Sequence, residues 1–158
     1  MPKELVNAVC VFTGKVSGVI YLEESKNKKQ VKIYGDVKGL KPGKHGFHVH
    51  EAGDLSEGCS SCCAHYNPYD KKHGGPKDTK RHVGDLGNIT ALKNGEARVD
   101  IVDSLIKLRG KYSVIGRSLV VHEDEDDLGL GDHDDSKTTG HAGARVACGV
   151  IGFRKNCK

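Results

Sequence analysis

The sequence predicts an all-β fold, an antiparallel sandwich or barrel made of short strands. Of its 158 residues, 21 are Gly, three are Phe, five are Tyr and none is Trp. This composition favours short strands and many turns over a helical bundle. Short apolar or alternating runs recur along the chain with turn signals between them, as in antiparallel β-proteins. The length predicts one domain, residues 1–158, with one sizeable core.

The first third of the chain reads as strands. In one of its runs Val31 and Ile33 alternate with Lys32 and Tyr34, the period of two of a half-buried strand. The predicted strands here are 8–12, 16–22, 31–36 and 46–50.

Strand-like patterning stops over residues 51–81, which are polar and rich in Gly and Pro. A loop of this length inside a compact domain usually has a function. A second such loop is expected over residues 123–144. The remaining predicted strands are 89–92, 97–101, 113–115, 118–122 and 145–153.

Charge and hydropathy exclude several classes of protein. The formal net charge of +4 is too small to indicate nucleic-acid binding. No stretch approaches the roughly 20 apolar residues of a membrane-spanning helix. Residues 1–7 lack the apolar run of a secretory signal, so we expect an intracellular, cytoplasmic protein and no disulfide-dense scaffold.

Histidines carry most of the functional information, because nine of them in 158 residues is an excess. His48 and His50 are two residues apart, so on a strand both imidazoles point to the same face. The candidate metal ligands are His48, His50, His65, His73, His82, Asp85 and His122.

These seven candidates are too many for one four-coordinate ion and one too few for two separate closed sites. The count fits if one imidazole bridges two ions. One site would then have three histidines and an aspartate, a donor set typical of Zn²⁺. The other would have four histidines, which suits Cu²⁺. On spacing alone the alternative stays open that these histidines are dispersed and serve the core or the surface.

Several motifs occur in order and with almost no gaps between Ala8 and Gly152, and together they resemble the intracellular copper/zinc superoxide dismutases. The motifs are Gly46-Phe47-His48-Val49-His50-Glu51, His65-Tyr66-Asn67-Pro68, Lys72-His73-Gly74-Gly75-Pro76, Arg81-His82-Val83-Gly84-Asp85-Leu86-Gly87-Asn88, Val120-Val121-His122-Glu123 and Gly143-Ala144-Arg145-Val146-Ala147-Cys148-Gly149-Val150-Ile151-Gly152.

The resemblance implies an eight-stranded antiparallel Greek-key barrel with two long functional loops. It implies dismutation of the superoxide anion to dioxygen and hydrogen peroxide, with copper and zinc as cofactors. Copper would alternate between two oxidation states, and a bridging histidine would link it to a structural zinc. A homodimer and loading by a copper chaperone are further implications.

Each residue's role also follows from the resemblance. His65 would bridge the metals and deliver a proton to the forming peroxide, Arg145 would hold the anion, and Asp126 would accept hydrogen bonds from one histidine of each site. Cys59 and Cys148 would form a disulfide. The implied copper ligands are His48, His50, His65 and His122, and the implied zinc ligands are His65, His73, His82 and Asp85.

The sequence departs from the family at a few positions. Cys62 and Cys63 stand where small residues are usual, and Ala52 replaces a bulky residue at the dimer contact, which predicts a weaker dimer or a monomer. Asp124 and Glu125 stand where many relatives have a lysine near the channel, and Lys137 is displaced by one residue. We therefore expect weaker electrostatic steering than the net charge suggests.

The remaining histidines and cysteines have ordinary interpretations. His45, His133 and His141 are expected at the surface, Cys10 in the core and Cys157 as an exposed thiol.

Two other functions fit the same barrel. One is a copper-delivery chaperone and the other an inactive metal-binding relative. The chain keeps every ligand and Arg145, which favours the enzyme over both.

Overall fold

The computed structural model describes residues 4–157, which form strands, loops and one short 3₁₀ turn. All of the longer strands alternate or cluster apolar residues in the way that the sequence predicts. Their bounds are β1 Asn7–Phe12, β2 Ser17–Glu24, β3 Val31–Lys38, β4 Gly43–His50, β6 Asp85–Ala91, β7 Ala97–Asp103, β8 Ser118–His122 and β9 Arg145–Val150. The shorter elements are β5 Ser56–Cys59, the 3₁₀ turn η1 Ser60–Cys62 and β10 Gly152–Arg154.

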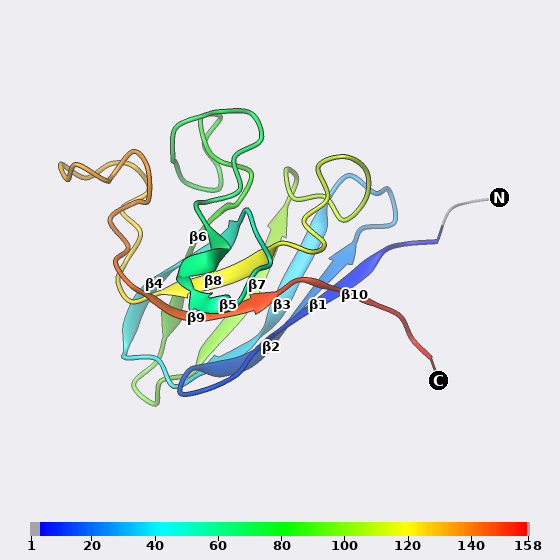
Figure 1. Cartoon of the computed structure of the whole chain (residues 1–158), viewed down its shortest axis with the longest axis horizontal. Coiled ribbons are helices and arrows are strands. Elements are labelled where there is room, and N and C mark those ends of the chain that lie inside the picture. Colours follow the sequence, from blue (N-terminus) through cyan, green and yellow to red (C-terminus); the bar gives the residue numbers. More distant parts are fainter. Residues whose placement is uncertain (1–3, 158) are drawn as a thin grey trace.

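All of the strands except β5 form one antiparallel sheet that curls into a nearly closed barrel (Figure 1). Its order is β10-β1-β2-β3-β7-β6-β4-β8-β9, so β4 is reached from β3 by crossing over β7 and β6. β10 pairs with β1 through Ala8 opposite Phe153, and β9 also packs beside β1. The all-β antiparallel barrel expected from the sequence is confirmed, with β5 and β10 as short additions to its eight main strands.

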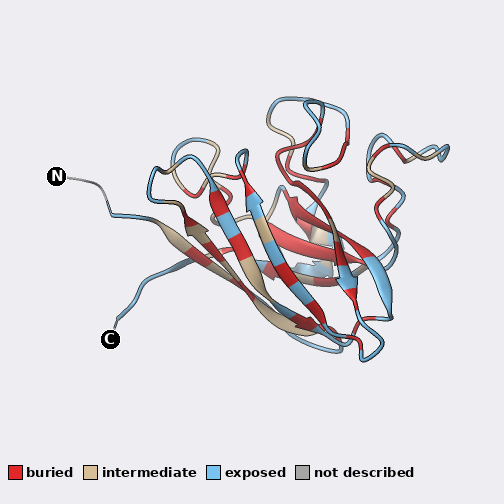
Figure 2. Ribbon diagram, turned by 180° about the vertical axis from the view of Figure 1, so that it is seen from behind, coloured by how far each residue is buried: buried red, intermediate tan, exposed pale blue. Residues whose placement is uncertain are grey.

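The barrel interior is filled by one face of each strand. On β3, Val31, Ile33 and Val37 are buried, while Lys32 and Asp36 are exposed. Figure 2 shows this alternation as buried and exposed bands along the strands. Burial of this apolar face drives formation of the barrel.

Strands β4 and β8 differ from the others because both of their faces are buried. Phe47 and Val49 of β4 belong to the hydrophobic core, whereas His48 and His50 point to the opposite, outer face. The outer face is buried because two loops cover it. We call residues 51–84, between β4 and β6, the first loop, and residues 123–144, between β8 and β9, the second loop.

Both loops rise on the same side of the barrel (Figures 1 and 2). Two register shifts lie beneath them, one between Gly46 and His48 where β4 meets β6, and one between Val121 and His122 where β8 meets β9. Bulges of this kind re-aim side chains next to functional sites.

The prediction of a strand over residues 113–115 is wrong. Val114 is fully buried, but it lies in the connection between β7 and β8. Its N–H donates to the Lys107 carbonyl, and its own carbonyl accepts from Arg117 N. The apolar side chain therefore fills the core from a turn, which a short apolar run cannot distinguish from a strand.

Within residues 4–157, the structure contains no helix long and apolar enough to cross a lipid bilayer.

Candidate metal centre

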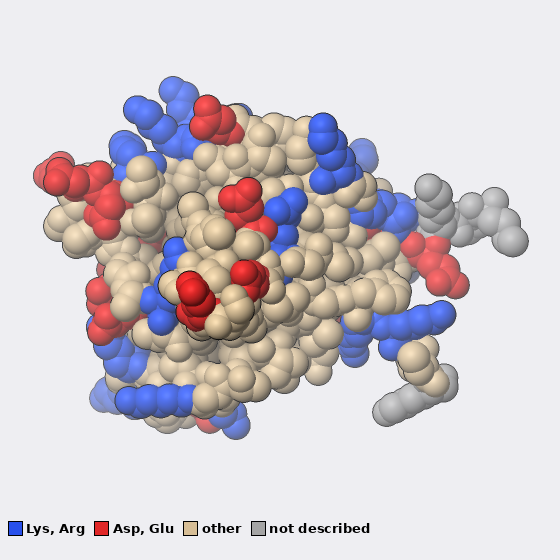
Figure 3. Space-filling model, in the orientation of Figure 1, with Lys and Arg blue, Asp and Glu red and all other residues tan. Residues whose placement is uncertain are grey.

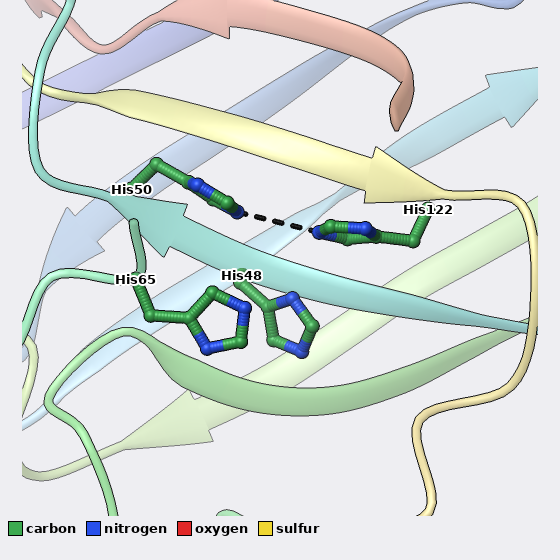
Figure 4. A group of neighbouring side chains, drawn as sticks. All are labelled: His48, His50, His65 and His122. Carbon is green, nitrogen blue, oxygen red and sulfur yellow. Dashed lines mark hydrogen bonds between the residues drawn. The ribbon is translucent and has the colours of Figure 1, made fainter. Parts of the chain in front are cut away.

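Four histidines meet on the outer face of β4 and β8. His48 and His50 come from β4, His122 ends β8, and His65 comes from the first loop, which an isolated β-bridge joins to His50. One nitrogen from each ring lies within 4.8 Å of the others, and all four residues are buried. Figure 4 shows the four rings converging, with His50 Nε2 and His122 Nε2 3.3 Å apart.

Hydrogen bonds at the far side of these rings fix which nitrogen faces the cluster. His50 Nδ1 donates to the Cys63 carbonyl at 2.8 Å, and His122 Nδ1 donates to the Gly143 carbonyl at 3.0 Å. Because a neutral imidazole has one N–H, each Nε2 then carries a lone pair. The two lone pairs face one another across 3.3 Å, an arrangement that a cation between them would stabilise.

A second cluster contains His65, His73, His82 and Asp85, which also lie within 4.8 Å of one another. Asp85 Oδ1 lies 3.0 Å from His65 Nδ1, 2.9 Å from His73 Nδ1 and 3.2 Å from His82 Nδ1. The other carboxylate oxygen accepts from the backbone N–H groups of His82 and Gly74 at 2.8 and 3.1 Å. The aspartate is therefore fixed by the chain and presents one oxygen to the three rings.

His65 belongs to both clusters. Its Nδ1 faces Asp85, while its Nε2 is buried and has no hydrogen-bond partner. The ring lies 4.0 Å from the His48 ring, centroid to centroid, and is tilted by 33° to it. One imidazole thus offers a nitrogen to each of two neighbouring sites.

Asp126 of the second loop joins the two clusters from behind. Its two oxygens accept from His48 Nε2 at 2.6 Å and from His73 Nε2 at 2.7 Å. Both rings therefore direct Nδ1 into the clusters. Carboxylates in this position orient histidine ligands and raise their basicity.

Asn88 of β6 holds Asp126 in place, a role that the sequence did not reveal. Its amide N–H donates to the Asp126 carbonyl at 3.0 Å, and its Oδ1 accepts from Asp126 N at 2.7 Å. The two residues are 38 positions apart, so no local pattern could have indicated this contact.

The donor atoms fit a pair of bound cations. Among the described residues, three buried side-chain nitrogens lack a hydrogen bond: His48 Nδ1, His65 Nε2 and His73 Nδ1. His73 Nδ1 lies close to Asp85 Oδ1, but their geometry is not that of a hydrogen bond. An unsatisfied buried polar atom costs about 1–3 kcal/mol. A cation in each cluster would satisfy all three nitrogens.

Burial shifts the protonation of the four clustered histidines. It lowers the pKa of His48, His50 and His65, and it lowers the pKa of His122 to about 4. These rings are therefore neutral near pH 7 and can donate lone pairs.

The second cluster behaves differently, because a carboxylate lies at its centre. Burial opposes the charge on Asp85, but close contacts with the three histidines outweigh burial and hold the pKa of its carboxyl well below the usual range. Burial also lowers the pKa of His73, but contacts with Asp126 and Asp85 outweigh it and raise the pKa to about 9. With one carboxylate among three imidazoles, this cluster offers a harder donor set than the four-histidine cluster.

A cavity of about 1050 Å³ leads to the four-histidine cluster. His50, His65 and His122 lie on its wall, with Arg145 from the start of β9. Arg145 Nη1 donates to the Cys59 carbonyl at 2.7 Å, which fixes the guanidinium beside the four-histidine cluster. The cationic side chains on the wall are Lys71, Lys72, Lys111, Arg117, Lys137 and Arg145.

The predicted disulfide is confirmed. Cys59 and Cys148 are bonded, their Cα atoms are 5.6 Å apart, and the bond ties the first loop to β9. Cys10 is buried, as expected, and burial raises the pKa of its thiol to about 12. Cys157 is exposed, also as expected.

The prediction that His45 lies at the surface is wrong. The residue is 1% exposed, with Nδ1 2.8 Å from the His122 carbonyl and Nε2 2.8 Å from the Lys41 carbonyl. These two contacts connect the turn before β4 to the end of β8. His133 and His141 are exposed, as predicted, and their rings stack 3.5 Å apart.

Comparisons with known proteins agree on one family. The family model described as copper/zinc superoxide dismutase matches residues 16–151. The chain is 57% identical over 151 residues to a Cu-Zn superoxide dismutase of Paramecium bursaria Chlorella virus 1, covering 95% of this chain and 80% of that protein. It is 52% identical over 151 residues to Cu-Zn superoxide dismutase 5 of Dictyostelium discoideum, covering 95% and 99%.

A solved structure shares the fold along almost the whole chain. The crystal structure of the clock protein EA4 superimposes with a TM-score of 0.92 at 46% identity, covering 98% of both chains.

Proposed function

The chain belongs to the copper/zinc superoxide dismutase family, and we propose how its own residues divide the reaction. The protein is an oxidoreductase that converts superoxide to dioxygen and hydrogen peroxide, with copper and zinc as cofactors. Copper, when bound, supplies the one-electron chemistry by alternate reduction and reoxidation, whereas zinc is redox-silent.

We assign copper to the four-histidine cluster and zinc to the cluster around Asp85. Four imidazoles suit the tetragonal preference of Cu²⁺, and three imidazoles with one carboxylate suit tetrahedral Zn²⁺. The copper ligands are His48, His50, His65 and His122. The zinc ligands are His65, His73, His82 and Asp85. The single observation that carries this assignment is that His65 offers one nitrogen to each cluster.

Arg145 binds and orients the substrate anion. Its guanidinium is charged at every relevant pH and lies on the cavity wall beside His65 and His122. The hydrogen bond to the Cys59 carbonyl occupies Nη1 and leaves other N–H groups of the fork for superoxide.

His65 holds and delivers a proton at Nε2. This atom faces the four-histidine cluster and has no protein partner, so no side chain competes for the proton. Zinc held by His73, His82 and Asp85 would occupy Nδ1 and keep the ring oriented while Nε2 changes its protonation. The peroxide leaving the cavity is the natural acceptor of this proton.

Metal analysis and a superoxide-consumption assay on the reconstituted chain test the proposed function. We expect one copper and one zinc per chain and rapid turnover. A chain that binds both metals and delivers copper to an acceptor protein without turnover would instead be a chaperone. Zinc alone with no turnover would indicate a structural relative.

We also propose that the chain forms a homodimer through the outer face of β1, β9 and β10. Val11, Val150 and Phe153 are 50, 39 and 62% exposed on these neighbouring strands. An apolar patch of this kind marks an interaction site. Phe153→Glu places a charge in the patch, so sedimentation velocity should show a monomer where the unaltered chain is a dimer. A monomeric unaltered chain would contradict this proposal.

Residues 1–158 are proposed to act as one domain, with the family match spanning 16–151. A cytoplasmic location and loading by a copper-delivery protein stay predictions, which cell fractionation and co-purification would test.

A further inference from the structure

The first loop holds a second possible partner for the disulfide-bonded Cys59. Cys59, Ser60, Ser61 and Cys62 form a Cys-x-x-Cys sequence. In a cysteine pair at this spacing the two thiols readily exchange disulfides. The copper/zinc chemistry described above uses neither Cys62 nor this spacing.

The local backbone brings the two cysteines to the same face of one turn. Cys59 has φ −75° and ψ −16° and caps η1, which ends at Cys62. In a 3₁₀ turn, residues three apart are eclipsed and rise about 2.0 Å per residue, which separates their Cα atoms by about 6 Å. Disulfides join Cα atoms about 4.4–6.8 Å apart. Cys62 is therefore within disulfide reach of Cys59, as is Cys148 at 5.6 Å.

Cys62 is a free thiol held inside the protein. It is fully buried, and its Sγ makes a weak contact with the Asp54 carbonyl at 3.8 Å. Ala52 N donates to the Cys62 carbonyl at 3.0 Å, which fixes the backbone of the turn. Cys63, the next residue, is exposed, and its φ of +67° turns the chain away from the turn.

We propose that Cys62 is the exchange partner of the Cys59–Cys148 disulfide. The thiolate of Cys62 attacks Cys59 Sγ, a Cys59–Cys62 bond forms, and Cys148 leaves as a thiolate that takes up the proton lost by Cys62. One disulfide and one thiol are present before and after, so no external oxidant or reductant is required.

The exchange would release the first loop from β9. In the Cys59–Cys148 form, the covalent bond holds the Cys59 carbonyl where Arg145 donates to it. In the Cys59–Cys62 form, this carbonyl is tied only to its own turn. The position of the anion-binding guanidinium then depends on which of two cysteines Cys59 is bonded to.

Disulfide mapping of the metal-loaded chain tests the proposal. The protein is incubated without reductant at pH 8.5 for about a day, longer than the minutes to hours of uncatalysed rearrangement. It is then quenched in acid, alkylated under denaturing conditions and digested with trypsin. Cleavage gives peptide 45–71, with Cys59, Cys62 and Cys63, and peptide 146–154, with Cys148.

The peptides distinguish exchange from reduction. Exchange gives a labelled Cys148 together with a 45–71 peptide that carries one label, whereas reduction gives three labels on 45–71. We expect labelling of Cys148 to exceed that of the Cys62→Ser variant by at least about tenfold and to appear more slowly at pH 6.5, where less thiolate is present.

The Cys63→Ser variant is the matched control, because it removes the neighbouring thiol and leaves Cys62 in place. It should retain the labelling of Cys148. Loss of labelling in Cys63→Ser but not in Cys62→Ser would overturn the assignment to Cys62. A chain in which Cys148 stays unlabelled throughout the incubation would overturn the exchange itself, whatever its superoxide activity.

Discussion

Asp126 is the residue on which both metal clusters depend. Its carboxylate accepts one hydrogen bond from each cluster, and Asn88 fixes its backbone. None of its atoms needs to touch a metal for it to orient two histidines at once.

Replacement of Asp126 by Asn should weaken both sites. The carboxylate now accepts hydrogen bonds from two imidazole N–H groups. The amide has only one acceptor oxygen, so its NH₂ group must face one of these N–H donors, and that hydrogen bond is lost. We expect the affinity for copper and zinc to fall about 10- to 100-fold, the usual effect of losing such a carboxylate. Competition titrations with chelators measure it.

Glu125→Gln is the control, since Glu125 is exposed and pairs with Lys44 at 3.5 Å rather than with a metal ligand. Equal metal affinities for the two variants would show that Asp126 does not act through His48 and His73.

At the scale of elements, one ion pair ties strand β2 to the connection between β7 and β8. Arg109 donates through Nε and Nη2 to the two oxygens of Glu24, each at 2.7 Å. Glu24 also accepts from Val6 N at 2.8 Å, and Arg109 reaches the Glu4 carbonyl at 2.7 Å. The pair therefore also anchors the segment before β1.

This pair makes stability depend on pH. The hydrogen bond from Arg109 lowers the pKa of Glu24 below its ordinary value of 4.5. A lowered carboxyl pKa adds stability that is present above the unfolded-state value and is lost as pH falls through the folded-state value. Glu24→Gln should therefore unfold at a lower urea concentration than the unaltered chain at pH 7. The difference between the two urea midpoints should narrow below about pH 4.5.

The urea midpoints of both proteins are measured at each pH. Both proteins lose metal in the same way as the pH falls, so this effect cancels in the difference between their midpoints. A gap that stays constant from pH 7 to pH 3 would contradict the role of the Glu24 charge.

Sequence patterns predicted the strands that bury only one face. They do not show which side chains face the core in strands whose outer face is covered by loops. The alternation in β3 and β7 follows from a core on one side and water on the other. β4 and β8 are buried on both faces by loops, so their pattern does not show which residues face the barrel interior. His45 is buried through contacts with the Lys41 and His122 carbonyls, and the second of these lies far away in the sequence.

The clustering of the candidate ligands was predictable because their spacing and motifs are local. Their supports were not, because contacts such as Asn88 with Asp126 or Arg145 with Cys59 join residues 38 and 86 positions apart. Such contacts depend on the closed barrel, and no short window of sequence contains both partners.

At the scale of the whole molecule, charge is distributed unevenly (Figure 3). Basic side chains gather over the first loop and acidic side chains at the tip of the second. The sequence predicted weak steering from Asp124 and Glu125, but neither lies on the cavity wall, and they pair with Lys41 and Lys44 at 2.9 and 3.5 Å. The wall carries six cationic side chains against Glu51, Asp70 and Asp135.

This structure therefore revises the expected salt dependence. We expect the rate of superoxide consumption to fall several-fold as the Debye length shortens from about 30 Å at 0.01 M salt to about 8 Å at 0.15 M. Lys111→Gln should lower the rate at low salt more than Lys44→Gln does, although each removes one positive charge. A rate that does not change with salt would support the weak steering predicted from the sequence.

The covered outer face of β4 and β8 gives the protein two interiors. One is apolar and lies inside the barrel, and none of its side chains belongs to the two metal clusters. The other is polar and lies outside the barrel, and it consists of imidazoles and carboxylates that the two loops cover. Maturation can accordingly proceed in stages, with the apolar interior assembled first by an ion-free chain and the polar one completed when its cations arrive.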